Sequence, residues 1–198
     1  PSSQPVRFIS MGRLLHWKGF HLGIQAFAKA NLPDAEYWLV GDGPELESLK
    51  HLAQDYGVEH QVKFWGRLPR ENTLERLGES HVLVHPSLHD SGGWVCIEAM
   101  ASGRPVICLD LGGPAIQVTE QTGFKVVAQE PELTITEMAK AMQTIANDPE
   151  LRVQMGKAGR QLVNDNFNWN VVGERLDTLY LGLAAKVYRS ASARVSFY

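Results

Sequence analysis

Six short apolar runs alternate with amphipathic helical stretches along this chain, and that alternation limits the possible folds more than any other feature. Strands that alternate with helices form right-handed βαβ crossovers, which build a parallel sheet covered on both faces. We therefore predict an α/β fold, a Rossmann-like, doubly wound parallel sheet of about six strands with a helical C-terminal segment. The expected strands are Val6–Met11, Tyr37–Val40, Val62–Trp65, His81–His85, Pro105–Asp110 and Gly123–Val127. The expected helices between them are Lys18–Ala30, Glu45–Tyr56, Glu71–Glu79 and Trp94–Ser102.

The last third of the chain is helical in pattern. Helical spacing runs from Glu132 onward, with breaks near Asp148–Pro149 and around Phe167–Trp169, and a last helix is expected over Trp169–Val187. We predict a single domain over residues 1–198, with a core of about 6–183 and a basic tail at 184–198. The tail carries Lys186, Arg189 and Arg194. A solvated end is favoured over contact with a membrane surface or an acidic partner.

Charge and cysteine usage exclude several classes of protein. Nineteen Lys and Arg against 22 Asp and Glu give a net charge of −3, so no global basic field is available to hold nucleic acid. No apolar run is long enough to span a bilayer, and the first residues lack a signal-peptide pattern. Cys96 and Cys108 lie in apolar runs, which predicts buried thiols in a reducing, cytoplasmic compartment, with peripheral contact at the inner face of a membrane left open. The start at Pro1 suggests a piece of a longer protein.

The loops after the strands are where such a sheet binds ligands. The first loop, GRLLHWKG over 12–19, places Arg13 and Lys18 near the start of a helix, where they could neutralise a pyrophosphate or simply be solvated cations. His16 is interpreted as an ordinary loop residue. The chain has no GxxxxGK[ST] loop, and the GxG at 41–43 has Leu46 where a dinucleotide fingerprint needs glycine. NAD binding is therefore not expected.

A second group of polar residues follows the fourth strand. Asp90 lies in the loop and Glu98 about one turn into the next helix, so both carboxylates face one cleft and could accept sugar hydroxyls. Gly92 and Gly93 leave their backbone N–H groups accessible. A metal site is disfavoured, because the possible ligands lack a recognised spacing; they are His85, His89, Asp90 and Glu98. The pair Gly112–Gly113 could bind phosphate or form a tight turn, and the residues leave both open.

Together these motifs resemble the C-terminal, nucleotide-sugar-binding domain of GT-B fold glycosyltransferases of the retaining family 4 (glycosyl transferases group 1). The resemblance covers about 6–183 and rests on GRLLHWKG (12–19), LVGDGPELESL (39–49), VKFWGRL (62–68), HPSLHDSGGWVCIEAMASGRPVI (85–107), Gly112–Gly113 and FNWNVVGERL (167–176). It implies that Arg13 and Lys18 hold the donor diphosphate and that Glu98 binds the ribose. The catalytic group so implied is Arg13, Lys18, Asp90 and Glu98. The implied nucleotide-sugar contacts further include Gly12, Gly41, Gly66, Arg67, Leu68, Ser91, Gly92, Gly93, Trp94, Val95, Gly112 and Gly113.

Three positions depart from the family pattern. Asp90 replaces the usual Glu, Ser91–Gly93 replaces GFG, and Ile116–Gln117 stands where a Glu is frequent. The resemblance implies transfer of a glycosyl unit from a UDP-, GDP- or ADP-sugar, with retention and without a cofactor or metal. The acceptor, a glycan, lipid or small molecule, would be bound by an N-terminal domain that this chain lacks. The isolated chain would then bind nucleotide but transfer little sugar. The alternatives are a non-hydrolysing nucleotide-sugar epimerase of the same architecture and a non-catalytic nucleotide-binding module.

Overall fold

A computed structural model describes the backbone of residues 5–195 and the side chains of residues 5–184. By their contacts the residues divide into two compact units, 1–161 and 162–198. The larger unit contains a six-stranded parallel sheet in the order β3-β2-β1-β4-β5-β6. The strands are β1 (Val6–Met11), β2 (Ala35–Val40), β3 (Val62–Gly66), β4 (Val82–His85), β5 (Val106–Leu109) and β6 (Gly123–Val126). The predicted fold class is confirmed, and the six strands lie where the sequence predicts them, with ends that differ by one or two residues.

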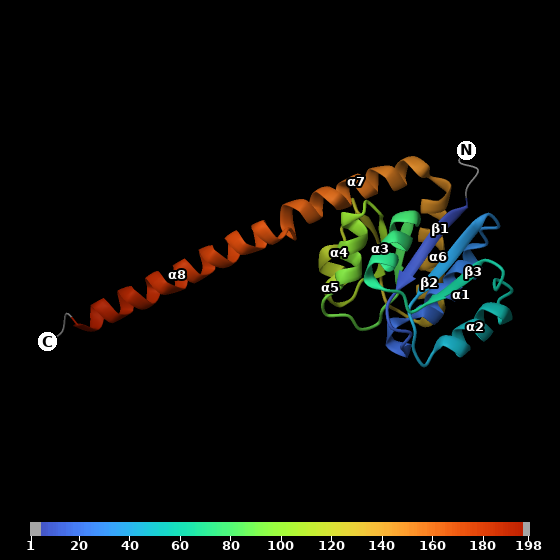
Figure 1. The fold of residues 1–198 in the computed structure, drawn as a ribbon, viewed down its shortest axis with the longest axis horizontal. Coiled ribbons are helices and arrows are strands. Elements are labelled where there is room, and N and C mark those ends of the chain that lie inside the picture. The colour runs from blue at the N-terminus through green and yellow to red at the C-terminus, as the bar shows by residue number, and fades with distance from the viewer. Residues whose placement is uncertain (1–4, 196–198) are drawn as a thin grey trace. The chain divides into compact units, whose positions relative to one another are not determined.

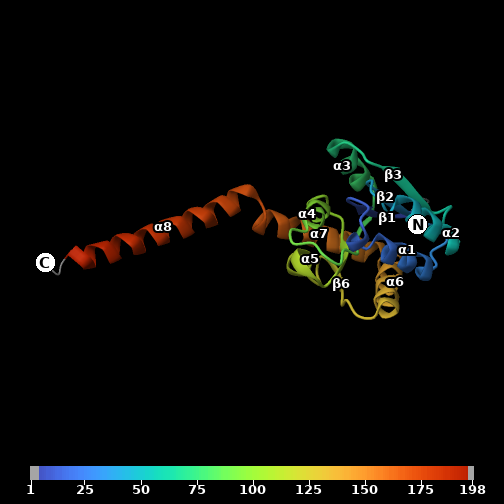
Figure 2. The same ribbon diagram turned by 90° about the horizontal axis from the view of Figure 1, so that it is seen from below.

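Helices cover both faces of the sheet (Figures 1 and 2). On one face α1 (Phe20–Ala30) packs against both α2 (Leu46–Asp55) and α6 (Pro131–Asn147). On the other face lie α3 (Arg70–Glu79), α4 (Trp94–Ala101) and the short α5 (Gly112–Gln117). Right-handed crossovers produce this division, because the chain moves outward from β1 to β3 and then returns across the sheet to β4. The order of the strands therefore reverses between β1 and β4, which is where ligands bind in such sheets.

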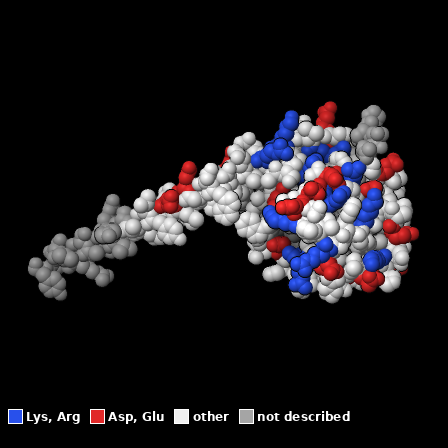
Figure 3. All heavy atoms as spheres, viewed as in Figure 1, with Lys and Arg blue, Asp and Glu red and all other residues white. Residues whose placement is uncertain are grey.

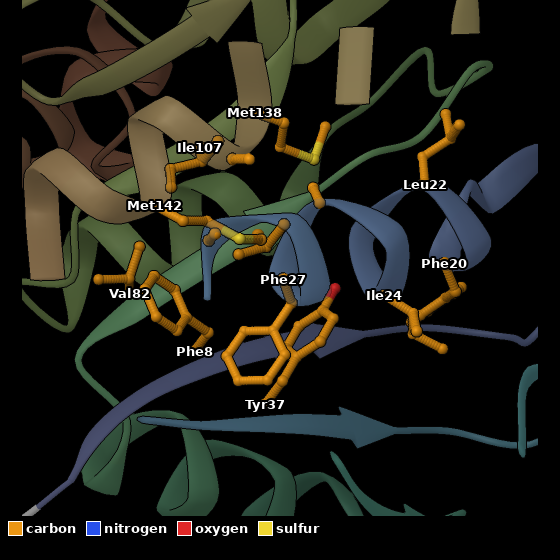
Figure 4. Close-up of a cluster of buried hydrophobic side chains, with 14 of the residues drawn as sticks. Phe8, Phe20, Leu22, Ile24, Phe27, Tyr37, Val82, Ile107, Met138 and Met142 are labelled. Atoms are coloured by element: carbon orange, nitrogen blue, oxygen red, sulfur yellow. The ribbon is translucent and has the colours of Figure 1, made fainter. Parts of the chain in front are cut away.

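The main core lies between the sheet and the face covered by α1 and α6 (Figure 4). Phe8 of β1, Phe27 of α1 and Tyr37 of β2 are buried, and the ring of Phe27 contacts the rings of the other two. Met138 and Met142 of α6 complete this layer (Figure 4). The one polar atom of Tyr37, its hydroxyl, lies 2.6 Å from Ser10 Oγ, which donates to Val84 O. The buried hydroxyl is thus satisfied, and burial raises the pKa of Tyr37.

The first helix begins later than the sequence predicts. A short 3₁₀ helix, η1 (His16–Lys18), precedes it, and Gly19 separates the two with φ of 67°. A Cβ at Gly19 would lie 1.9 Å from Pro86 O, so this position needs glycine for both its conformation and its close approach to the next loop. Lys18 consequently ends η1 instead of standing in the first turn of α1.

The opposite edge of the sheet, where the strands begin and the helices end, is capped by arginines. Arg104 donates to Gly78 O at the end of α3, Arg160 to Ala101 O at the end of α4, and Arg152 to Ile145 O and Ala146 O in α6. Helix C-termini carry partial negative charge and unpaired carbonyls, so cations there are stabilising. Within the described part of the chain these three arginines form no ion pair with a carboxylate. The face of the molecule seen in Figure 3 intersperses acidic with basic side chains and shows no continuous basic surface.

The chain ends in α7 (Pro149–Asn166) and α8 (Trp169–Val195), so the predicted helix breaks are confirmed. The last helix continues beyond the predicted Val187. Leu179, Tyr180 and Leu183 of α8 are exposed. The side chains of the predicted basic tail, Lys186, Arg189 and Arg194, lie outside the described residues. Among the helices that the structure describes, none has the length and apolar character needed to cross a bilayer.

Candidate functional site

A cavity of about 550 Å³ opens at the carboxyl ends of β1, β2 and β3 and is bounded by α4. Of the residues singled out in the sequence, those that line it are Gly12, Arg13, Gly41, Arg67, Leu68, Val95 and Glu98. Met11, Val40, Asp42, Gly43 and Thr73 also line it. Met11, Val40, Asp42 and Gly43 are sequence neighbours of the predicted residues. Thr73 lies in α3 and belongs to no motif found in the sequence. The cavity therefore lies at the sheet edge where an open parallel sheet binds its ligands.

Backbone hydrogen bonds tie the three loops of this cavity together. Gly12 N donates to Val40 O at 3.0 Å, and Gly41 N donates to Gly66 O at 2.8 Å. Leu14 N, also in the loop after β1, donates to Asp42 O in the loop after β2 at 3.0 Å. The cavity floor is thus built from backbone that the sheet itself positions, so it is preformed.

The charged side chains of the cavity differ in whether they are paired. Arg13 and Arg67 are exposed and form no ion pair among the residues that the structure describes. Glu98 is partly buried, and its Oε1 forms an ion pair with Arg70 Nη1, 2.8 Å away. The sequence does not predict a role in the site for Arg70, the first residue of α3, because no motif or spacing relates it to Glu98, 28 positions later. The cavity therefore offers two guanidinium groups without an ion pair among the described residues, and one carboxylate whose partner is an exposed side chain.

Lys18 and Asp90 form a second cluster on the same two segments, the loop after β1 and the loop that leads into α4. Lys18 Nζ donates to Asp90 Oδ2 at 2.7 Å. Asp90 Oδ1 accepts from the backbone N–H groups of Gly92 at 3.2 Å and Gly93 at 2.9 Å. The N–H groups that the sequence leaves accessible at Gly92 and Gly93 are thus occupied by Asp90, and Lys18 is held in place by the same carboxylate.

The environment of Asp90 keeps it ionised. Burial raises its pKa, but the hydrogen bonds from Lys18 and Gly93, together with the charge of Lys18, outweigh burial and bring the pKa to about 2. His85 Nε2 lies 3.2 Å from Asp90 Oδ2 and forms no hydrogen bond. Burial is the main reason that the pKa of His85 falls to about 4, and the charge of Lys18 lowers it further against the opposing effect of Asp90. At neutral pH the cluster therefore contains one cation, one anion and a neutral imidazole.

The paired glycines at 112–113 pack against the loop of Asp90. Gly113 N donates to Asp90 O at 2.9 Å, so this N–H is not free for a phosphate. A Cβ at Gly113 would lie 2.5 Å from Ser91 O, so only glycine permits this approach. Gln117, one of the departures from the family pattern, is buried and donates from Nε2 to Gly92 O at 2.6 Å. Of the two interpretations left open for Gly112–Gly113, the close turn is the one that these contacts favour.

The remaining predicted residues lie around this loop. Ser91 is exposed, and Trp94, the first residue of α4, is 67% exposed. Gly66 ends β3, directly before the cavity residues Arg67 and Leu68. The possible metal ligands do not gather: the described residues include no group of three or more His, Cys, Asp or Glu placed to hold a metal ion. Cys96 and Cys108 are free and buried, as predicted; burial raises the pKa of both thiols, that of Cys108 to about 12.

Comparison with known proteins identifies the family. The family model for glycosyl transferases group 1 matches residues 2–162. The chain belongs to this family. The lipopolysaccharide core biosynthesis glycosyltransferase LpsE of Rhizobium meliloti is 33% identical over 93% of this chain and 51% of its own length. The family found in this way is the group 1 family that the sequence motifs resemble.

Two solved structures show the same fold. Sucrose-phosphate synthase from Thermosynechococcus elongatus aligns with a TM-score of 0.80 and 32% identity, over 94% of this chain and 47% of its own. Anabaena Alr3699/HepE in complex with UDP aligns with a TM-score of 0.80 and 25% identity, over 90% of this chain and 49% of its own. This group 1 chain thus spans about half the length of the relatives that it matches.

Proposed function

We propose that this chain is the donor-binding half of a retaining, family 4 glycosyltransferase, and that its cavity binds the nucleoside diphosphate of a nucleotide sugar. The observation that carries the proposal is the preformed cavity at the ends of β1–β3, which combines the free cations Arg13 and Arg67 with the carboxylate Glu98. Guanidinium groups match diphosphate oxygens, and an ionised carboxylate can accept from two vicinal hydroxyls. HepE, a structural neighbour, is described in complex with UDP.

Each end of the nucleotide has a proposed partner. Arg13 and Lys18 bind the diphosphate, Glu98 accepts from the ribose hydroxyls, and Gly66–Leu68 lie beside the base. Glu98 must exchange Arg70 for ribose. That exchange costs little, because Arg70 is 74% exposed and exposed ion pairs contribute only about 0–1 kcal/mol. Asp90 and the 91–94 backbone lie toward the donor sugar.

The proposed chemistry is stabilisation of a leaving group. The nucleoside diphosphate gains negative charge as its bond to the sugar breaks, and Arg13 and Lys18 stand ready to compensate that charge. We propose that these two cations make a divalent metal unnecessary. The acceptor would be held by a further domain of a longer protein. The transfer of the sugar to it would retain the anomeric configuration. A cytoplasmic setting is proposed on the two free, buried thiols.

Calorimetric titration with UDP, GDP and ADP tests the proposal. One of the three should bind, with the same affinity in EDTA, and Arg13→Ala and Lys18→Ala should each weaken binding about tenfold, the loss of one charge-assisted contact. Lys157→Ala, which removes an exposed cation of α7, is the matched control and should bind like the wild type. If none of the three nucleotides binds, or if Arg13→Ala and Lys157→Ala bind equally well, the assignment of the cavity is wrong.

A further inference from the structure

Two side chains, Lys18 and His85, converge on a single carboxylate oxygen of Asp90 beside the cavity. Asp90 Oδ2 lies 2.7 Å from Lys18 Nζ and 3.2 Å from His85 Nε2. The first contact is a hydrogen bond, whereas His85 Nε2 is buried and has no hydrogen-bond partner. The His85 residue is only 5% exposed, so bulk water does not satisfy the ring nitrogen either. An unpaired buried nitrogen at this distance from a charged oxygen is costly, and a functional reason for it is to be expected.

The surroundings of His85 contain few other charges. Asp90 comes from its own loop and Lys18 from the end of η1. Cys108 of β5 is its register partner across the sheet, and Cys96 of α4 lies near the same pair. Both thiols stay neutral because burial raises their pKa. The protonation of His85 is therefore governed by Lys18, which disfavours it, and by Asp90, which favours it.

We propose that His85 is a positioning residue: when a bound diphosphate draws Lys18 away, His85 gains a proton and takes over the Asp90 oxygen that Lys18 leaves. This inference rests on the proposed function of the cavity. The proton comes from solvent and is held at Nε2, and no bond to the nucleotide is made or broken. Protonation follows because the diphosphate neutralises Lys18 and so removes the charge that opposes an imidazolium. Asp90, still ionised, then keeps a cationic partner.

The replacement of Lys18 by His85 as the partner of Asp90 would keep the conformation of the Asp90 loop while Lys18 moves. Asp90 Oδ1 holds the N–H groups of Gly92 and Gly93, and Asp90 O holds Gly113 N. An Asp90 without a cation would be an unpaired charge in a partly buried site, which is unfavourable. His85 is placed to prevent that state, so the loop that leads into α4 stays in position during donor binding.

Proton linkage provides the test. If binding moves the pKa of His85 from about 4 to about 6, the ratio of the affinity at pH 5.5 to that at pH 7.5 should be about fourfold larger for the wild type than for His85→Asn, with an additional uptake of about 0.7 proton at pH 5.5. We would titrate the wild type, His85→Asn and His89→Asn with UDP, GDP and ADP at both pH values, in buffers of different ionisation enthalpy. His89 is an exposed histidine of the same loop and serves as the matched control. The proton exchange of the nucleotide's own phosphate is common to all three proteins and cancels in the comparison.

The wild type and His89→Asn should show the additional uptake, and His85→Asn should lack it. Equal uptake by His85→Asn and the wild type would overturn the inference while leaving nucleotide binding intact. Absence of binding by any nucleotide would overturn the proposed function and this inference together. Should His85→Asn fail to fold, the pKa of the His85 ring is measured by NMR in the free and nucleotide-saturated wild type; an unchanged pKa contradicts the proposal.

Discussion

Arg70 Nη1 and Glu98 Oε1 lie 2.8 Å apart, one at the start of α3 and the other in α4, on the border of the candidate cavity. The pair joins an exposed cation to the one carboxylate proposed to receive ribose. Because Arg70 is much more exposed than Glu98, Arg70 can leave at little cost and the partly buried Glu98 is then open to the ribose hydroxyls.

The first prediction concerns this carboxylate. Glu98→Gln should weaken binding of the nucleoside diphosphate about tenfold, because an amide oxygen replaces an ionised acceptor for two hydroxyls. The 2′-deoxy form of the same nucleotide should bind the wild type about tenfold more weakly than the nucleotide itself. It should bind Glu98→Gln as tightly as the nucleotide does. Arg70→Ala should change affinity less than threefold, as expected for an exposed pair. Additive losses for Glu98→Gln and the deoxynucleotide would show that Glu98 does not bind the ribose.

The second prediction concerns the close contact between two loops. Gly113→Ala should lower the free energy of unfolding by about 2 kcal/mol or more, because its Cβ would meet the backbone oxygen of Ser91. Gly78→Ala, in α3 with no atom near the added methyl, should be neutral or stabilise by up to about 1 kcal/mol. Urea unfolding measures both. Equal stability of the two variants would contradict the packing role of Gly113.

The third prediction concerns the arginines at the far edge of the sheet. Arg152 donates to Ile145 O at 2.5 Å and Ala146 O at 2.8 Å, so Arg152→Ala should cost about 1–2 kcal/mol of stability. Nucleotide affinity should not change, since Arg152 lies at the edge opposite to the cavity. Lys157→Ala on the same helix is the control and should unfold like the wild type. A loss of nucleotide affinity in Arg152→Ala, with stability intact, would contradict a purely structural role.

The fourth prediction concerns pH. Burial lowers the pKa of both His81 and His85 to about 4, so the unfolded chain binds more protons than the folded one between about pH 6.5 and 4. The stability that these two neutral histidines contribute is therefore fully present above pH 6.5 and is lost as pH falls toward 4. For the buried His85 the loss at pH 5 is up to ~2 kcal/mol, and for the more exposed His81 it is smaller. Urea unfolding at pH 7.5 and 5.0 should show this decrease; equal free energies at the two values would refute it.

Asp90 contributes to acid sensitivity in a different range. Its pKa is lowered to about 2, so the stability that its ionised form provides is present above its unfolded value and is lost only as pH falls toward 2. A measurement at pH 5.0 therefore separates the histidines from this carboxylate.

The sheet could be predicted closely because its signals are local. Each strand is an apolar run closed by glycine, proline or a polar turn, and the buried β4 and β5 show this most clearly. The start of α1 differs from the prediction because the chain makes a left-handed turn at Gly19, which packs closely against Pro86, a residue far away in the sequence. The extent of α8 was underestimated because no helix-breaking residue marks where it ends.

The sequence predicts which loops form the site, but it does not predict which side chains contact one another there. Strand order brings Arg13, Arg67 and Glu98 to one cavity, and the glycines around them indicated which loops to consider. Side-chain pairing depends on how distant elements meet, so the contacts of Glu98 with Arg70 and of Gln117 with the Asp90 loop could not be read from spacing. Gln117 belongs to the pair that departs from the family pattern, and the structure shows it buried and donating to the backbone oxygen of Gly92.

The central claim is that the cavity at the ends of β1–β3 binds a nucleoside diphosphate. The most direct measurement is an amide NMR titration of the ¹⁵N-labelled chain with UDP, GDP and ADP. The account predicts saturable shifts for one nucleotide, at the amides of Gly12, Arg13, Gly41, Arg67 and Leu68, with those around Arg104 and Arg152 unmoved. Shifts confined to the Arg104 and Arg152 edge, or no saturable shift with any of the three, would contradict it.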